Sequence, residues 1–205
     1  MVTIKSIVYL RSMACMTLDD ERKVWLTRSD FLESGWREGS SVERKLFDHF
    51  IQIHQYPHAM NQAVSMLARR PCSKGEILQS LSLHHYFEDV IAMVICRLEK
   101  EDLLNDQEFS ELWVQQRCKK FGIRRIRQEL RLKGVPEPIL NMAISQISDE
   151  QMMENAIALA VKAWSKIKPG EDLRKSRQKI ISCLVRKGFD WETSKLASDA
   201  AEKRR

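Results

Sequence analysis

Half of all the lysine and arginine in this 205-residue chain lies in two short stretches, residues 117–133 and 162–187. The first stretch holds eight basic residues and one acid, and the second holds nine basic residues and two acids. Long cationic side chains at this density can bind the phosphates of a nucleic acid or the carboxylates of another protein. The chemistry that these residues indicate is therefore recognition of an anionic partner.

Helical spacing gathers the first stretch into a cationic face. At roughly 100° per residue, Arg124, Arg127 and Arg131 share one arc of a helix, beside an apolar edge that contains Ile126 and Leu130. The predicted helix therefore buries one edge and presents positive charge on the next. We take nine residues as candidate contacts with a protein or DNA partner: Arg124, Arg127, Arg131 and Lys133 in the first stretch, and Arg174, Arg177, Lys179, Arg186 and Lys187 in the second.

A solvated surface is the alternative interpretation of the same charges. Arg125 and Glu129 are four residues apart, so they can pair along the helix while the remaining charges only solvate it. The distribution of charge favours a partner, because residues 1–116 carry a net charge of −4 and residues 117–205 carry +10. An asymmetric field of this kind steers association with nucleic acid or with an acidic protein surface.

Sequence patterns that build a catalytic or metal site are absent from the chain. It contains no GxxxxGK, GxGxxG, GxSxG or HExxH motif. His49, His54 and His58 are irregularly spaced, and no cysteine or carboxylate cluster completes a set of metal ligands with them. We therefore expect a protein that is not an enzyme, with no catalytic residue, no metal and no cofactor.

Cysteine use and hydropathy indicate the cellular compartment. The five cysteines are odd in number and widely separated, and none forms a CxxC pair, which is typical of reduced thiols. No run of about 18 uncharged apolar residues exists, and the N-terminal stretch lacks a cleavage site. We expect a soluble, cytoplasmic monomer without membrane contact. The tryptophans are scattered and are expected to anchor packing: Trp25, Trp36, Trp113, Trp164 and Trp191.

The first 57 residues predict a small unit that contains a β-hairpin. Ser40 and Glu43 have the spacing of a capping box, which predicts a helix that runs to Tyr56 and stops before Pro57. Upstream of it, the sequence predicts strands at 3–10, 15–18 and 23–27 and a short helix at 29–34 that ends at Gly35.

From residue 58 onward the chain predicts helices in groups of three. The residues from Ile126 to Val135 match those from Ile180 to Phe189 at a constant offset of 54, including Gly134 with Gly188. A weaker match to the first group puts His85 where the glycine stands in the others. The nine helices are expected at 59–70, 74–81, 86–100, 107–120, 123–133, 136–147, 150–167, 171–187 and 190–201.

This repetition predicts a mainly α fold of tandem three-helix repeats in an elongated, curved array. Each group is too small to bury its own apolar faces, so stacking of neighbouring repeats supplies the core. The expected division is an N-terminal mixed unit at 1–57 and repeats at 58–105, 106–148 and 149–205.

Four segments of this chain resemble the RecX family of regulators of the RecA recombinase. They are SMLARRPCSKGEIL (65–78), LLNDQEFSELWVQQR (103–117), GIRRIRQELRLKGV (122–135) and IISCLVRKGFDWE (180–192), and the resemblance covers about residues 58–200. It implies tandem three-helix repeats and a non-enzymatic role. It also implies binding to the RecA filament on DNA, either single-stranded within the filament or duplex, and restraint of its assembly, ATP hydrolysis, strand exchange and co-protease activity.

A second hypothesis does not involve a recombinase. The basic helices could form a stand-alone nucleic-acid-binding module whose affinity falls steeply with salt, because each phosphate contact releases counterions. A filament regulator would instead bind bare DNA weakly and act once the filament exists.

Overall fold

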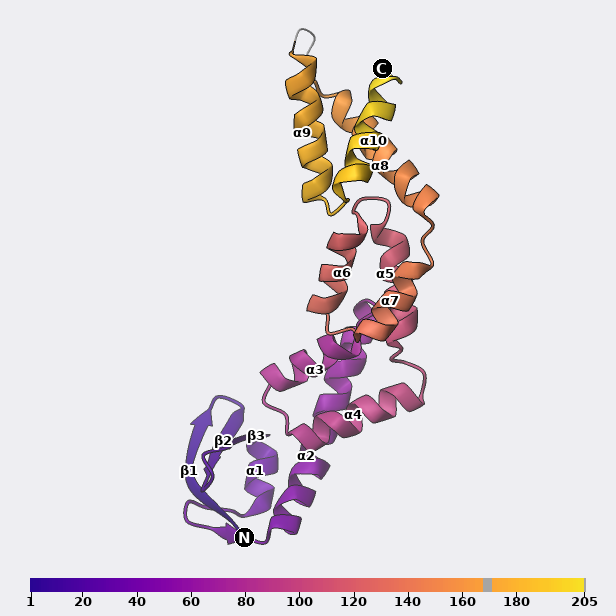
Figure 1. Cartoon of the computed structure of the whole chain (residues 1–205). Helices are drawn as coiled ribbons and strands as arrows, with labels where there is room; N and C mark the ends of the chain where they lie inside the picture. Colours follow the sequence, from indigo (N-terminus) through magenta and orange to yellow (C-terminus); the bar gives the residue numbers. More distant parts are fainter. Residues whose placement is uncertain (168–170, 205) are drawn as a thin grey trace. The chain divides into compact units, whose positions relative to one another are not determined.

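The computed structural model describes residues 1–167 and 171–204, and within them the chain forms ten helices and four strands (Figure 1). The predicted mainly helical architecture with a small strand-bearing N-terminal part is confirmed. The chain divides into two compact units, Met1–Asn105 and Asp106–Arg205. The first unit carries 13 Lys and Arg against 14 Asp and Glu, and the second carries 21 against 14. The positive charge therefore belongs to the second unit.

An antiparallel sheet in the order β3-β2-β1-β4 forms the start of the first unit. The three predicted strands are confirmed as β1 (Val2–Leu10), β2 (Met13–Leu18) and β3 (Lys23–Thr27). The short helix α1 (Arg28–Ser34) follows, with the Thr27 side chain accepting a hydrogen bond at its N-terminus and Gly35 in the left-handed region at its C-terminus. One face of the sheet packs with α1 and the start of the next helix around Phe31, Phe47 and Ile51.

The capping box predicted at Ser40 does not form, because the sheet recruits this segment. The Ser40 side chain accepts a hydrogen bond from the Arg37 N–H at 2.9 Å, and the Ser40 carbonyl accepts one from the Ile4 N–H at 3.0 Å. The next two residues form β4 (Ser41–Val42), which pairs with the start of β1. Pairing with β1 therefore outcompetes the local cap.

The predicted helix end before Pro57 is also wrong. Helix α2 (Arg44–Arg69) runs through Pro57 without a break, and the predicted division between 1–57 and 58–105 falls inside it. A proline inside a helix loses one backbone hydrogen bond. Burial of one continuous face on both sides of the proline outweighs that loss, and the buried residues recur every four positions: Phe47, Ile51, Gln55, Ala59 and Ala63.

The first helical group consists of the C-terminal half of α2 together with α3 (Lys74–Leu83) and α4 (Glu88–Lys100). The predicted capping box is confirmed here, since the Ser73 side chain accepts from the Glu76 N–H and the Glu76 carboxylate accepts from the Ser73 N–H, both at 3.2 Å. His85 has φ 60°, so it adopts the left-handed conformation that glycine adopts in the later groups. Its ring stacks on Trp25 with 5.1 Å between ring centroids.

The second unit contains two helical groups, and its six predicted helices are confirmed with ends shifted by at most three residues. Gly134 and Gly188, which the sequence repeat places at equivalent positions, both have positive φ in the turn after a middle helix. The helices are α5 (Asp106–Arg117), α6 (Ile123–Leu132), α7 (Glu137–Ser145), α8 (Asp149–Trp164), α9 (Leu173–Arg186) and α10 (Trp191–Glu202).

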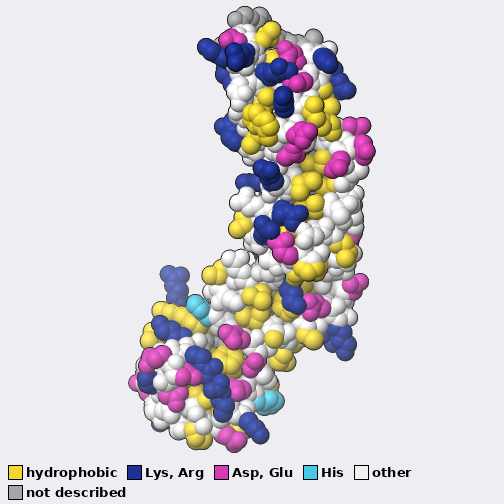
Figure 2. All heavy atoms as spheres, in the orientation of Figure 1, with side chains coloured by type: hydrophobic (Ala, Val, Ile, Leu, Met, Phe, Trp, Pro, Cys, Tyr) yellow, Lys and Arg dark blue, Asp and Glu magenta, His cyan; other side chains and the backbone are white. Residues whose placement is uncertain are grey.

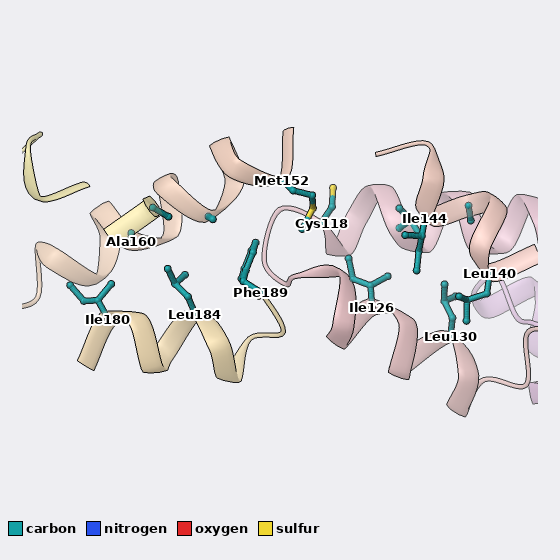
Figure 3. Close-up of a cluster of buried hydrophobic side chains, with 14 of the residues drawn as sticks. Cys118, Ile126, Leu130, Leu140, Ile144, Met152, Ala160, Ile180, Leu184 and Phe189 are labelled. Atoms are coloured by element: carbon teal, nitrogen blue, oxygen red, sulfur yellow. The ribbon is translucent and has the colours of Figure 1, made fainter. Parts of the chain in front are cut away.

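One hydrophobic cluster runs through both groups of the second unit (Figure 3). Ile126 and Leu130 of α6 are fully buried, as predicted. Leu184 of α9 occupies the position equivalent to Leu130 and is also buried. Phe189 is 2% exposed and lies between the two groups (Figure 3). The two repeats of this unit therefore share a core.

The backbones of these two repeats also meet directly. The Gly122 N–H donates to the Lys187 carbonyl at 3.0 Å, and the Arg124 N–H donates to the Gly188 carbonyl at 3.2 Å. A Cβ atom at Gly122 would lie 2.3 Å from the carbonyl carbon of Gly188. The contact therefore requires a glycine at position 122, although its own φ of −79° suits any residue.

Candidate cationic interface

Helix α6 carries the first group of candidate residues, and its apolar edge fixes how it lies. Ile126 and Leu130 are buried in the shared core, which turns Arg124 and Arg131 outward and leaves Arg127 half-buried. The predicted placement of these arginines on one arc beside the core edge is therefore what the structure contains.

Two residues of this arc face α7 and are paired there. The Arg127 guanidinium lies 3.6 Å from the Glu137 carboxylate and also donates to the Asn141 side chain. The Arg131 guanidinium donates to the same carboxylate of Glu137 and thereby lowers the pKa of Glu137 below its ordinary value. Arg127 and Arg131 thus tie α6 to α7, and Glu137 compensates part of their charge.

Glu129 on the opposite flank of α6 ties this helix to α5. Its carboxylate accepts hydrogen bonds from Arg117 Nε at 2.8 Å and Trp113 Nε1 at 3.2 Å. It also accepts from Arg125 Nε at 3.1 Å, which confirms the pairing predicted along the helix. Burial raises the pKa of Glu129, but the hydrogen bonds from Arg117 and Arg125 outweigh it and hold the pKa below its ordinary value.

Two of the three candidate lysines, Lys133 and Lys187, lie over aromatic rings. Lys133 Nζ is 4.2 Å from the centroid of the Trp113 ring, and Lys187 Nζ is 5.2 Å from that of Phe121. The Arg117 guanidinium also lies over Phe121, at 4.2 Å. Such cation–π contacts stabilise a packed arrangement of side chains. Lys133 and Lys187 therefore pack against rings of their own unit.

The candidates on α9 include one residue that is paired with another helix and one that is exposed. The Arg177 side chain pairs with Asp199 and lies 3.7 Å from the Glu202 carboxylate, so it ties α9 to α10. Lys179 Nζ lies 3.2 Å from the Glu171 carboxylate, and 70% of the lysine side chain is exposed. An ion pair that exposed contributes little to stability and exchanges readily with solvent. Lys179 is therefore available to a partner where Arg177 is not.

Three of the nine candidates are exposed and make no ion pair within the described part of the chain: Arg124, Arg174 and Arg186. Arg124 lies close enough to Asp190 to act on its carboxyl group. Burial raises the pKa of Asp190, hydrogen bonds from Thr193 lower it below its ordinary value, and the positive charge of Arg124 adds to the lowering. Lys168, which belongs to the second basic stretch, lies outside the described residues.

The outer face of α9 and the start of α10 form a shallow groove, which we call the α9 groove. Seven residues line it: Lys175, Gln178, Lys179, Ser182, Val185, Arg186 and Trp191. Trp191 is 54% exposed, so the prediction that every tryptophan anchors packing is wrong at this position. By contrast Trp164 is 3% exposed, and its Nε1 donates to the Ser198 carbonyl.

Lys175 and Trp191 were not among the predicted contact residues. The spacing of Lys175, Lys179, Ser182 and Arg186 by four, three and four positions could have indicated a shared helix face. Trp191 gave no such signal, because an isolated tryptophan in a sequence is compatible with either burial or exposure.

The cations on the visible face of the second unit do not form an unbroken patch (Figure 2). On the face shown in Figure 2, Lys and Arg side chains lie among acidic and hydrophobic ones, in keeping with the ion pairs of Arg127, Arg131 and Arg177. The surface available to a partner therefore consists of separate exposed cationic side chains together with the α9 groove.

The described residues show no feature of a metal site or a membrane span. No group of three or more His, Cys, Asp and Glu side chains in 1–167 and 171–204 is placed to hold a metal ion. No helix within those ranges is long and apolar enough to cross a membrane. What the second unit offers chemically is positive charge and the exposed ring of Trp191.

Comparison with known protein families gives two matches, which lie in the second unit except for residue 105. The model described as RecX, second three-helix domain, matches residues 105–144, and the model of RecX, third three-helix domain, matches residues 149–197. These ranges correspond to the two helical groups α5–α7 and α8–α10.

Proteins named Regulatory protein RecX are similar over most of this chain. The one from Clostridioides difficile strain 630 is 30% identical over 161 residues, which is 78% of this chain and 75% of that protein. The one from Corynebacterium efficiens is 30% identical over 184 residues, which is 86% of this chain and 87% of that protein.

Two solved structures share the fold. A crystal structure of regulatory protein RecX has a TM-score of 0.65 at 21% identity and covers 97% of this chain and 100% of the solved one. That of RecX from Lactobacillus salivarius has a TM-score of 0.64 at 23% identity, covering 72% of this chain and 97% of the solved one.

Proposed function

The chain belongs to the RecX family, and on that premise we propose that it is a cytoplasmic, non-catalytic regulator of the RecA recombinase. It binds the RecA filament on DNA and restrains filament assembly, ATP hydrolysis, strand exchange and co-protease activity. It acts through surface complementarity, and no step of its action needs a cofactor.

The observation that carries this proposal is the place of the positive charge. The unit that the two RecX domain models match has 21 basic residues against 14 acidic ones, whereas the first unit is close to neutral. A filament on DNA contains phosphates, and a cationic unit is attracted to them.

The nine candidate residues have different roles in this proposal. Arg124, Arg174 and Arg186 are direct contacts, because they are exposed and make no ion pair among the described residues. Lys179 joins them when its exposed pair with Glu171 opens. The other five hold helices together or pack on aromatic rings: Arg127, Arg131, Lys133, Arg177 and Lys187.

The test is DNA-dependent ATP hydrolysis by the cognate RecA during titration of this protein. We expect the wild-type chain to inhibit at well below one molecule per recombinase. The triple variant Arg124→Ala, Arg174→Ala and Arg186→Ala should need a higher concentration for the same inhibition while keeping the wild-type melting temperature, because all three side chains are exposed.

The matched control removes the same charge elsewhere in the second unit. Lys162, Lys195 and Lys203 are exposed and outside the candidate set, so their triple alanine variant should inhibit almost as well as wild type. Equal losses in both triple variants would show that only net charge matters and would remove the assigned contacts. No inhibition by the wild-type chain, together with tight and salt-sensitive binding to bare DNA, would replace the proposal with a stand-alone nucleic-acid-binding module.

A further inference from the structure

Trp191 is an exposed aromatic residue in a cationic setting. Its side chain is 54% exposed, whereas the other four tryptophans are buried or half-buried. Exposing an indole to water forfeits the free energy that burial would provide, so an exposed tryptophan among polar neighbours is informative. The α9 groove, which Trp191 lines, is also lined by Lys175, Lys179 and Arg186.

Local structure holds Trp191 in place. Phe189, two residues before it, is buried in the shared core at 2% exposure. Asp190 caps α10, because its carboxylate accepts from the Thr193 N–H at 2.8 Å and from the Thr193 hydroxyl at 2.6 Å. Trp191 is the first residue of the capped helix. Its backbone is therefore fixed before any ligand arrives, which lowers the entropic cost of binding.

The charge of the α9 groove selects an anionic ligand. Three of its seven lining residues are cationic, and none of the seven is acidic. Of the two acidic neighbours of Trp191, Asp190 is engaged by the cap, and neither Asp190 nor Glu192 lines the groove. Glu171 pairs with Lys179, but that pair is exposed and weak.

The combination of cations and an exposed indole selects a single-stranded nucleic acid. Lys175 and Arg186 are eleven positions apart on one helix, so they span about 16 Å, which is the length of roughly five stacked nucleotides. The bases of a single strand are free to stack on an aromatic side chain, whereas the bases inside a duplex already stack on each other. An acidic peptide would use the cations but not the face of the indole.

We propose that the α9 groove is a binding site for single-stranded nucleic acid, in which a base stacks on Trp191 while Lys175, Lys179 and Arg186 bind the flanking phosphates. The site deepens the proposed function and rests on it for its setting, a filament that contains single-stranded DNA. Its binding chemistry belongs to this chain alone, so it can be measured without the recombinase.

The test is fluorescence anisotropy with a labelled 15-nucleotide oligo(dT) and a labelled 15-base-pair duplex at several salt concentrations. Trp191→Leu keeps an apolar side chain but loses the aromatic face, so it should weaken oligo(dT) binding roughly 5- to 150-fold, the loss typical of one base–aromatic stack. Trp191→Phe should recover most of the affinity. Lys175→Ala and Arg186→Ala should each lower the salt slope by about 0.7, whereas Trp191→Leu should leave it unchanged.

Controls separate this site from other effects. Leu132 is 78% exposed on α6 and outside the groove, so Leu132→Ala should bind oligo(dT) like wild type. Duplex affinity should not respond to Trp191→Leu. An unchanged oligo(dT) affinity in Trp191→Leu, or equal losses on single strand and duplex, would overturn the inference.

Recombinase ATP hydrolysis, measured with the same variants, separates the two proposals. If Trp191→Leu binds oligo(dT) normally but no longer inhibits the filament, the groove contacts protein; the nucleic-acid site is then refuted while the regulator remains. If oligo(dT) binding depends on Trp191 but neither the wild type nor any variant changes ATP hydrolysis by the recombinase, the proposed function is refuted and the nucleic-acid site remains.

Discussion

Replacing Gly122 with alanine should uncouple the two repeats of the second unit. The added Cβ would lie 2.3 Å from both the Gly188 carbonyl carbon and the Phe189 nitrogen. These are backbone atoms, which cannot rotate away, and ordinary contact requires about 3.4 Å or more. The two backbones must therefore separate by about 1 Å, and both hydrogen bonds across the contact lengthen beyond use.

The expected cost follows from these contacts. Two lost hydrogen bonds remove about 1–3 kcal/mol, and the strain of overpacking adds about 1–3 kcal/mol. Alanine offsets about 0.4–1 kcal/mol by restricting the unfolded chain. The midpoints of these ranges give a net loss of about 3 kcal/mol in the free energy of unfolding, which corresponds to a fall of roughly 12–24 °C in the melting temperature of a 100-residue unit.

The assay combines thermal unfolding by circular dichroism with amide hydrogen exchange. In the wild-type chain the Arg124 N–H donates to the Gly188 carbonyl and should be protected. In the variant this amide should exchange much faster. Gly39→Ala is the matched control: Gly39 has φ 83° and open space around it, so alanine there costs only about 1 kcal/mol of conformational strain. A Gly122→Ala variant as stable as wild type, with Arg124 still protected, would show that the repeats do not meet at this point.

Three further outcomes follow from buried groups. Leu130→Ala should lower the free energy of unfolding by about 2–5 kcal/mol, because Leu130 is fully buried. Urea denaturation measures this loss. A loss under 1 kcal/mol would mean that the surrounding core collapses into the cavity. The pKa of Glu129 is lowered in the folded chain, so its charge stabilises the fold above pH 4.5, and this stabilisation is lost as the pH falls further. The melting temperature of the wild type should therefore exceed that of Glu129→Gln near neutral pH and approach it in acid. A difference in melting temperature that does not depend on pH would contradict the ion-pair account. Gln55→Ala should lower the free energy of unfolding, measured by chemical denaturation, by about 2–4 kcal/mol. The buried Gln55 amide donates to the Trp25 carbonyl at 2.6 Å and accepts from the Phe87 N–H at 2.8 Å. An unchanged free energy of unfolding would imply that water replaces the amide.

Local rules predicted the second unit well because local and tertiary preferences agree there. The glycine after each middle helix and the apolar spacing of Ile126 with Leu130 specify the same turn and the same buried edge that the fold uses. The failures at Ser40 and Pro57 have the opposite cause. Pairing with β1 recruits the segment after Ser40, and one buried face carries α2 through Pro57. Sequence reasoning from neighbouring residues cannot weigh such distant contacts.

The sequence predicted which arginines share a helix face but not which of them are paired within the chain. Helical spacing located Arg124, Arg127 and Arg131 on one arc, but it could not show that Glu137 lies within reach of two of them, across a turn. Whether an arginine is available to a partner depends on such pairing. The exposure of Trp191 likewise depends on where α10 begins against α9, which no local pattern encodes.

The continuity of α2 makes the first 105 residues a single mechanical piece. The same 26-residue helix contributes Phe47 and Ile51 to the core beneath the sheet and Ala59 and Ala63 to the core of the first helical group. Because one continuous helix belongs to both cores, a displacement of either core moves the other. The strands therefore cannot separate from the first helical group as an independent domain. A truncated protein that starts near residue 58 would lack half of this rod, and the remaining helices would have to fold against an incomplete partner.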